Sequence, residues 1–156
     1  MTTTALTSRQ TNPAFALEGA MDALQAVSKA VSRARLPIPR ELVHLRASQI
    51  NGCGVCVDMH AKLARKSGES EERVFSVAAW REAPFYTDAE RAAFALTEAL
   101  TRIADQPDPV PDELWDEVSE HFDEQQRAAL VLDIASVNVW NRLNVATRQI
   151  VEPGMF

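Results

Sequence analysis

Two cysteines three positions apart, followed four positions later by a histidine, are the residues of this sequence best suited to chemistry. On an α-helix, Cys53, Cys56 and His60 would share one face, because side chains three, four and seven positions apart point the same way. The thiolate is the nucleophile and the metal ligand, yet a thiol with a pKa of about 8.5 is mostly protonated at neutral pH. A helix N-terminus and a neighbouring histidine would both favour the thiolate. The spacing therefore indicates thiol redox chemistry or metal binding.

A carboxylate in the preceding segment can complete this cluster. Glu41 belongs to a predicted helix over residues 40–50, and an Asn-Gly pair breaks the chain directly before the cysteines. If the two helices pack antiparallel across this break, Glu41 can orient His60 as the third member of a proton relay. His44 and His121 have no partner that the sequence identifies, and we expect both at the surface or in packing roles.

Other interpretations of the cysteine pair stay open. Zinc could be bound by both cysteines and His60, with Glu41 or His44 as the fourth ligand, although structural zinc sites usually hold two paired motifs. The two cysteines could also be buried packing residues. A c-type haem site is excluded because Val57, not histidine, follows the second cysteine, and a thioredoxin-type site would need a βαβ pattern. The residues favour a redox pair, with zinc and packing as the alternatives.

Composition limits the classes of function. The 156 residues are enough for one domain, and 46% apolar with 24% charged residues is typical of a globular chain. Sixteen Lys and Arg against 22 Asp and Glu give a net charge of −6, so we expect no nucleic-acid partner. No apolar run could cross a bilayer and the start does not resemble a leader, so we expect a cytoplasmic protein without membrane contact. No glycine-rich phosphate loop is found, and we expect no cofactor.

Helical periodicity dominates the chain, and hairpin signals between alternating apolar runs are missing. Capping residues open predicted helices at Asn12, Ser70, Thr87 and Asp123. Helices are expected from residue 13 to the prolines at 37 and 39, over 40–50, over 53–66, from 71, from 88, over 112–122 and over 124–150. We expect a flexible N-terminus over residues 1–12 and a single all-α domain over residues 13–156, built as a bundle of six to seven helices.

The last predicted helix is apolar on more than one side, with Leu130, Val137 and Trp140 among its large residues. A helix of this kind is buried in the domain or between subunits. We expect Trp140, like Trp80 and Trp115, to fill the core or an interface and not to form a cofactor site.

The segment around the cysteines is similar to a known family. Glu41, eleven residues, Cys53-x-x-Cys56, three residues and His60 resemble the core motif of the alkyl hydroperoxidase D and carboxymuconolactone decarboxylase superfamily. Further likenesses are Ala64-Arg65, Gly68 and the run Asn138-x-Trp140-Asn141-Arg142. The resemblance implies a thiol peroxidase for hydrogen peroxide or organic hydroperoxides. Cys56 would attack the O–O bond and become a sulfenic acid, and Cys53 would condense with it to a disulfide, releasing water.

The same resemblance implies partners and alternatives. His60 and Glu41 would form the proton relay, an external thiol or dithiol of protein or lipoyl type would reduce the disulfide, and the protein would be a dimer, trimer or hexamer. Well-known peroxidase members carry another histidine just before the second cysteine, where this chain has Val55, which is expected to weaken peroxidase activity. A carboxymuconolactone decarboxylase-like enzyme is one alternative that the resemblance implies, although that branch of the superfamily acts without the cysteine pair. A non-catalytic redox switch or interaction protein is the other alternative.

Overall fold

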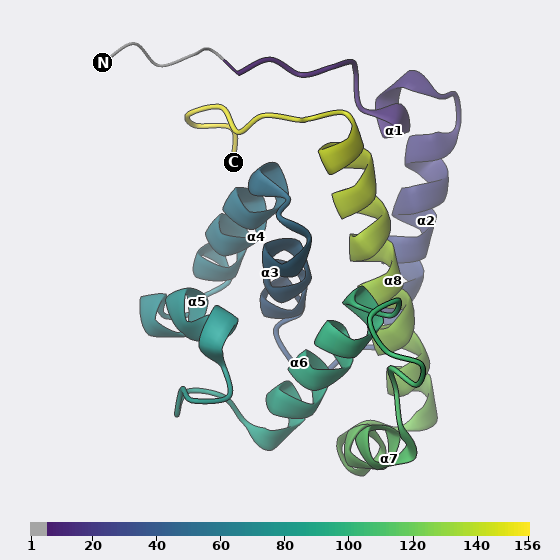
Figure 1. Ribbon diagram of the computed structural model, residues 1–156, viewed down its shortest axis with the longest axis vertical. Coiled ribbons are helices and arrows are strands. Elements are labelled where there is room, and N and C mark those ends of the chain that lie inside the picture. Colours follow the sequence, from purple (N-terminus) through teal and green to yellow (C-terminus); the bar gives the residue numbers. More distant parts are fainter. Residues whose placement is uncertain (1–5) are drawn as a thin grey trace.

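The computed structural model describes residues 6–156 as helices joined by loops, with no strand in that range (Figure 1). Within these residues the chain forms eight α-helices and one short 3-10 helix. They are α1 (Pro13–Ala16), α2 (Ala20–Arg33), α3 (Arg40–Asn51), α4 (Gly54–Lys66), α5 (Glu71–Ser76), the 3-10 helix η1 (Val77–Ala79), α6 (Asp88–Thr101), α7 (Asp112–His121) and α8 (Glu124–Ala146). The predicted all-α bundle is confirmed.

Side-chain caps start four helices at the residues that the sequence predicts, and Asn12 at the start of α1 is one of them. Thr87 Oγ1 accepts the backbone N–H of Glu90, and the Glu90 carboxylate accepts the backbone N–H of Thr87 in return. Asp123 and Gln126 form the same reciprocal pair at the start of α8. Ser70 accepts a backbone N–H in the first turn of α5. Each cap pairs backbone donors that a helix leaves free in its first turn, which fixes where these helices begin.

The first predicted helix is divided into two. α1 ends at Ala16 and α2 begins at Ala20, with Gly19 between them at a φ of 77°. Residues with a side chain rarely adopt this left-handed conformation, whereas glycine adopts it without a clash. Leu17, which continues the apolar repeat in the sequence, is 68% exposed at this break. The periodicity therefore predicted one helix where the chain turns between two.

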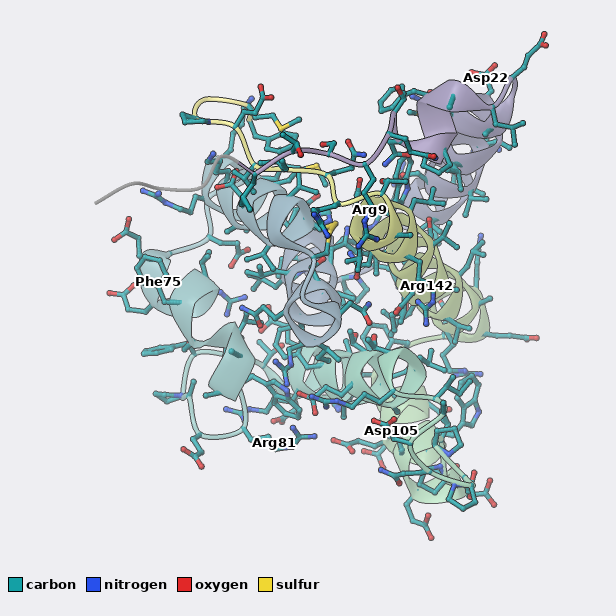
Figure 2. All side chains as sticks on the ribbon, turned by 45° about the horizontal axis from the view of Figure 1, so that its top comes forward. Arg9, Asp22, Phe75, Arg81, Asp105 and Arg142 are labelled. Carbon is teal, nitrogen blue, oxygen red and sulfur yellow. A yellow bond between two sulfur atoms is a disulfide. The ribbon has the colours of Figure 1, made fainter. Side chains whose placement is uncertain are left out.

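The segment before α1 lies along the end of α8 (Figure 1). Arg9, labelled in Figure 2, donates its backbone N–H to the carbonyl of Thr147 and its guanidinium to the carbonyl of Ala146, each at 2.9 Å. Gln149 Nε2 donates to the carbonyl of Gln10 at 2.9 Å. Residues 1–5 of the predicted flexible N-terminus lie outside the described residues, and the boundary between residues 12 and 13 stays a prediction.

α8 runs along the bundle and packs against α2, α3 and α6 (Figure 1). Its inner face is fully buried at Leu130 and Ile134, while Leu132 and Val139 are 42% and 41% exposed. The apolar residues on more than one side of this helix thus divide between a core face and an exposed face. The helix ends at Ala146, before the predicted end at residue 150. Within residues 6–156, no helix has the length and apolar character needed to cross a membrane.

α3 and α4 pack closely because the chain reverses direction between them. Gly52 ends α3 at a φ of 66°, a conformation that allows the tight turn, and α4 begins two residues later at Gly54. This reversal brings Glu41, in the first turn of α3, next to His60 in α4. The predicted packing of the two helices across the Asn-Gly break is confirmed.

Candidate active site

Cys53 and Cys56 are joined by a disulfide at the start of α4. Cys53 is the N-cap residue and Cys56 lies in the first turn, where backbone N–H groups have no partner within the helix. Each cysteine is 1% exposed. The partial positive charge of the helix start would stabilise a thiolate at Cys56 once the bond is reduced. The position therefore suits a cysteine pair that alternates between dithiol and disulfide.

Cys56 lines a pocket of about 470 Å³, and Cys53 is not among the lining residues. The sulfur of Cys56 is therefore the one that a small molecule in the pocket would meet. Charged and titratable lining residues are Arg40, Glu41, His44, His60 and Asp133. Apolar lining residues include Phe15, Val55, Met59, Val137, Trp140, Met155 and Phe156. A cavity of this size fits a small organic molecule with polar groups at one point.

His60 and Glu41 form the pair that the sequence predicts. Nδ1 of His60 lies 2.7 Å from Oε2 of Glu41. Because a carboxylate can only accept, Nδ1 carries the proton and Nε2 is left as the basic nitrogen. Burial lowers the pKa of His60 below its ordinary value of 6.5, although the hydrogen bond to Glu41 opposes this effect. At neutral pH, His60 is a neutral imidazole that can accept a proton.

Glu41 is ionised beside this imidazole. Burial raises the pKa of Glu41, but the hydrogen bond from His60 and nearby positive charges outweigh burial, so the pKa lies below its ordinary 4.5. The carboxylate thus fixes the orientation of the ring and would stabilise the imidazolium that forms when His60 takes a proton.

A second histidine joins the site. The ring of His44 packs edge-on against the ring of His60 with their centroids 4.8 Å apart. Its Nε2 lies 3.0 Å from Oδ1 of Asp133 on α8. The geometry of this contact is not that of a hydrogen bond, so Nε2 of His44 is a buried polar atom without a hydrogen-bond partner among the described residues. His44, for which the sequence identified no partner, thus lies in the lining of the pocket.

Asp133 is held by Arg40 from the start of α3. Nε and Nη2 of Arg40 donate to the two carboxylate oxygens at 2.9 and 2.6 Å. Burial alone would raise the pKa of Asp133, but these hydrogen bonds and the charge of Arg40 lower it from 3.8 to about 2. Asp133 is therefore a fixed negative charge at neutral pH. No sequence pattern points to this role, because an aspartate within a long helix has many possible partners.

Asn144 contacts the reactive sulfur directly. Its Nδ2 donates to Sγ of Cys56 at 3.3 Å. The orientation of the amide is fixed by Asn12, whose Nδ2 donates to Oδ1 of Asn144 at 2.7 Å. Asn12 also caps α1, so the first ordered turn of the chain supports the amide that faces the sulfur. Neither asparagine was expected at the site, since residues 12, 56 and 144 are brought together only by tertiary packing.

The structure brings together only some of the zinc ligands considered from the sequence. The cysteine sulfurs are bonded to each other and offer no thiolate in this state. Potential ligand atoms of Glu41, His44 and His60 nevertheless lie within 4.8 Å of one another. These three side chains could hold a metal ion. Two of them, Glu41 and His60, are hydrogen-bonded to each other and also form a proton relay.

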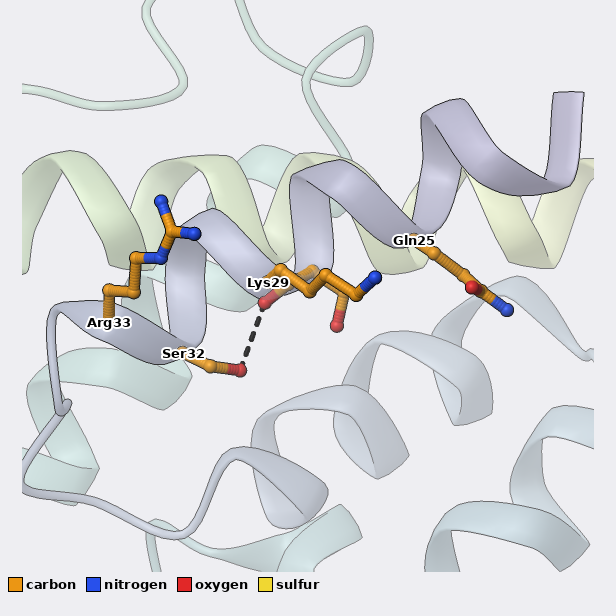
Figure 3. A pocket seen from close by; sticks show the side chains of 5 residues that line it. Gln25, Lys29, Ser32 and Arg33 are labelled. Atoms are coloured by element: carbon orange, nitrogen blue, oxygen red, sulfur yellow. Dashed lines mark hydrogen bonds between the residues drawn. The ribbon is translucent and has the colours of Figure 1, made fainter. Parts of the chain in front are cut away.

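The remaining predicted residues lie in varied surroundings. His121 is the last residue of α7 and does not line the pocket. Trp80 is buried, as expected, whereas Trp140 lines the pocket. A second hollow, shown in Figure 3, lies along α2. All five of its lining residues belong to that one helix, so it lacks the convergence of several elements that the Cys56 pocket has.

Comparison with known proteins gives consistent matches. The model of the carboxymuconolactone decarboxylase family matches residues 18–99. The uncharacterised protein YdfG of Bacillus subtilis (strain 168) is 49% identical over 107 residues, which are 69% of this chain and 71% of YdfG. The alkyl hydroperoxide reductase AhpD of Solibacter usitatus is 42% identical over 66 residues, which are 42% of this chain and 36% of that protein.

A solved structure extends the match to nearly the whole chain. It is a protein of unknown function from Agrobacterium tumefaciens, described as a candidate antioxidant defence protein AhpD. It superposes with a TM-score of 0.84 at 36% identity and covers 94% of this chain and 100% of that one. The region matched by the family model contains Glu41, both cysteines and His60. The chain therefore belongs to the carboxymuconolactone decarboxylase family and has the alkyl hydroperoxidase D-like fold.

Proposed function

We propose that this protein is a thiol peroxidase that reduces hydroperoxides through a Cys53–Cys56 disulfide. The observation that carries the proposal is that Cys56, in the first turn of α4, lines the same pocket as the hydrogen-bonded Glu41–His60 pair. A nucleophile, a base and a carboxylate that orients the base are the groups that an activated thiol requires. Similarity to an AhpD protein supports the same class of reaction.

The first step oxidises Cys56 in the reduced protein. Nε2 of His60 takes the thiol proton, and Glu41 stabilises the resulting imidazolium. The thiolate attacks the terminal oxygen of ROOH, so that an S–O bond forms while the O–O bond breaks. The released alkoxide takes up a proton and leaves as an alcohol, or as water when the substrate is hydrogen peroxide. Cys56–SH and ROOH thus give Cys56–SOH and ROH.

The second step forms the disulfide. The thiol of Cys53 attacks the sulfenic sulfur of Cys56, an S–S bond forms, and the sulfenic oxygen leaves as water. The Cα atoms of the two residues are 5.3 Å apart in the disulfide, within the usual range for such a bond. An external thiol or dithiol then returns two electrons and two protons. Because Cys56 faces the pocket, the reductant would attack its sulfur from there.

The lining of the pocket favours organic hydroperoxides over hydrogen peroxide. Apolar side chains such as Met59, Trp140 and Phe156 can contact an alkyl or aryl group, whereas hydrogen peroxide would leave most of the volume to solvent. Val55, at the position where the resemblance implies an additional histidine, also lines the pocket. It contributes apolar contact and no proton transfer.

We also retain homo-oligomer formation and a cytoplasmic location as proposals. Leu132, Val139 and Val145 on α8 are 42%, 41% and 47% exposed, and a second copy of the chain could cover them. Light scattering of the purified protein would measure the assembly. A cytoplasmic location would supply the thiol reductants that turnover needs.

Peroxide turnover and thiol counting test the proposed function together. The reduced protein, treated with one equivalent of cumene hydroperoxide, is expected to lose two thiols and a mass of about two hydrogens while cumyl alcohol appears. Cys56→Ser should form no alcohol, and Cys53→Ser should form one equivalent without closing a disulfide. Full turnover by Cys56→Ser would refute the proposal. Disulfide formation without catalytic turnover, even with excess dithiothreitol, would favour the redox-switch alternative.

A further inference from the structure

Fast cleavage of a peroxide needs an acid as well as a base. The thiol must lose a proton, and the departing alkoxide, which is a strong base, must gain one. His60 is suited to the first task, because it is neutral at neutral pH and bonded to the ionised Glu41. The second task calls for another proton donor in the same pocket.

We propose that His44, positioned by Asp133, is the general acid that protonates the alkoxide released from a hydroperoxide. This inference rests on the proposed peroxidase function and gives that reaction a further catalytic residue and a positioning residue. Both side chains line the pocket that contains Cys56. His44 is supplied by α3 and Asp133 by α8, so the pair forms only when these helices pack together.

Asp133 gives His44 the surroundings of a proton donor. Its Oδ1 lies 3.0 Å from Nε2 of His44, and the aspartate side chain is 2% exposed, so water screens its charge poorly. Arg40 holds both carboxylate oxygens, and its Nη1 donates to Oγ of Ser32 on α2 at 2.9 Å. A negative charge fixed in this way compensates the charge of an imidazolium, the form of His44 that can release a proton.

Val55, Glu41 and Arg40 also line the pocket, but they are not suited to donate a proton to the alkoxide. Val55, directly before Cys56, is apolar and cannot transfer a proton. Glu41 accepts the hydrogen bond from His60 and is ionised, so it has no proton to give. Arg40 keeps its protons, because its pKa is raised by the hydrogen bond to Asp133. Among the titratable lining residues, His44 remains, and its imidazole ring has nitrogens that can both give and accept a proton.

The contact between His44 and His60 allows both side chains to regain their starting protonation states after the reaction. After the O–O bond breaks, His60 holds the proton from the Cys56 thiol and His44 has given one to the alkoxide. The rings meet edge-on with centroids 4.8 Å apart, so His60 can return its proton to His44 directly or through a solvent molecule. The alcohol thus carries the proton that His44 gave, the thiol proton replaces it on His44, and both histidines regain their starting states.

Two oxidants with different leaving groups test this role. Cumene hydroperoxide releases a strongly basic alkoxide, whereas peracetic acid releases acetate, which leaves without needing a proton. For His44→Gln, kcat/KM should fall about a hundredfold with cumene hydroperoxide and at most about threefold with peracetic acid. His60→Gln should slow both reactions by similar factors, because thiol activation precedes both. His121→Gln, a histidine outside the pocket, is the matched control and should change neither.

Each outcome decides between the two proposals. Equal losses with the two oxidants in His44→Gln would overturn the general-acid role and leave the peroxidase function standing. Failure of the wild-type protein to reduce either oxidant would overturn both. If His44→Gln does not fold, Asp133→Asn should show the same selective loss with cumene hydroperoxide. Equal losses with the two oxidants in Asp133→Asn would also overturn the inference.

Discussion

The two sides of the pocket are built in different ways. On the α3–α4 side, Glu41, Cys56 and His60 belong to one continuous stretch, and helical spacing with one tight turn brings them together. On the α8 side, Asp133 and Asn144 reach the site only because α8 packs against the rest of the bundle. The first side carries the sulfur, its base and the carboxylate that orients the base, whereas the second supplies a hydrogen-bond donor to the sulfur and a fixed negative charge beside His44. The reactive residues are thus close together in the sequence, whereas the residues that adjust their surroundings are brought to the site by tertiary packing.

The largest effects should follow from changes on the α3–α4 side. His60→Gln removes the base for the Cys56 thiol, and Glu41→Gln removes the charge that stabilises the protonated base. We expect kcat/KM for cumene hydroperoxide to fall about a hundredfold or more in His60→Gln and somewhat less in Glu41→Gln. Steady-state peroxide consumption with excess dithiothreitol measures both. Glu120→Gln, an exposed carboxylate on α7, is the control.

A pH test sharpens the same comparison. Raising the pH towards the pKa of a free thiol should restore much of the activity of His60→Gln, because solvent then removes the proton that His60 normally takes. If His60→Gln stays equally inactive at every pH, the residue supports the fold or substrate binding and is not a base.

On the α8 side, Asp133→Asn should affect stability in a pH-dependent way. The folded protein holds the pKa of Asp133 at about 2 against an ordinary 3.8. A carboxyl group with a lowered folded pKa stabilises the folded state above its ordinary pKa, and this contribution is lost as the pH falls from about 4 to about 2. Its size corresponds to about 2 kcal/mol in the free energy of unfolding. Urea unfolding of wild type and variant at pH 5 and pH 3 measures it.

The variant and the wild type should therefore converge in acid. At pH 5 the wild type is expected to be more stable than Asp133→Asn, because the variant also leaves Arg40 without its carboxylate. The difference should shrink at pH 3. A difference that is constant across this range would show that the charge of Asp133 does not stabilise the fold.

Asn144→Ala should moderately lower the rate at which the Cys56 sulfur reacts with peroxide. The amide donates to Sγ of Cys56, and the loss of one such hydrogen bond corresponds to about 1 kcal/mol, or about fivefold in the rate of reaction with peroxide. Stopped-flow measurement of Cys56 oxidation is the suitable readout. Asn12→Ala, which removes the partner of Asn144 but not the donor to sulfur, should give a smaller decrease. The reverse order would argue that the Asn144 contact does not assist the thiolate.

The smallest effect should come from the apolar lining. Phe156→Ala removes part of the surface that can contact an organic group, so KM for cumene hydroperoxide should rise about threefold to tenfold. KM for hydrogen peroxide should not change, because that substrate makes no such contact. A parallel change for both substrates would mean that Phe156 acts on the site as a whole and does not select the substrate.

Local signals predicted much of the fold. The reciprocal caps at Thr87 and Asp123 fixed the starts of α6 and α8, because capping chemistry involves residues only three positions apart. The break at Gly19 was missed, since the apolar repeat continues through it and the left-handed conformation of one glycine leaves no trace in the periodicity. The end of α8 was predicted four residues too late, at residue 150 instead of Ala146. The apolar residue at position 150, which extended the predicted helix, lies in the segment that follows α8.

Local signals also predicted part of the candidate site. Glu41, Cys53, Cys56 and His60 could be placed together because helical spacing and one turn determine their geometry. His44 lies on the same predicted helix as Glu41, but its role depends on Asp133, which comes from α8. No local sequence pattern predicts a contact between residues so far apart in the chain. The contact between His44 and Asp133 is seen only in the folded structure.

The central claim is that Cys56 is the sulfur that attacks the peroxide, and trapping the sulfenic acid tests it most directly. Reduced Cys53→Ser and Cys56→Ser are each treated with one equivalent of cumene hydroperoxide in the presence of dimedone, and the modified residue is located by mass spectrometry. The account predicts a dimedone adduct on Cys56 in the first variant and none on Cys53 in the second. An adduct on Cys53 in Cys56→Ser, formed as fast as the one on Cys56, would contradict it.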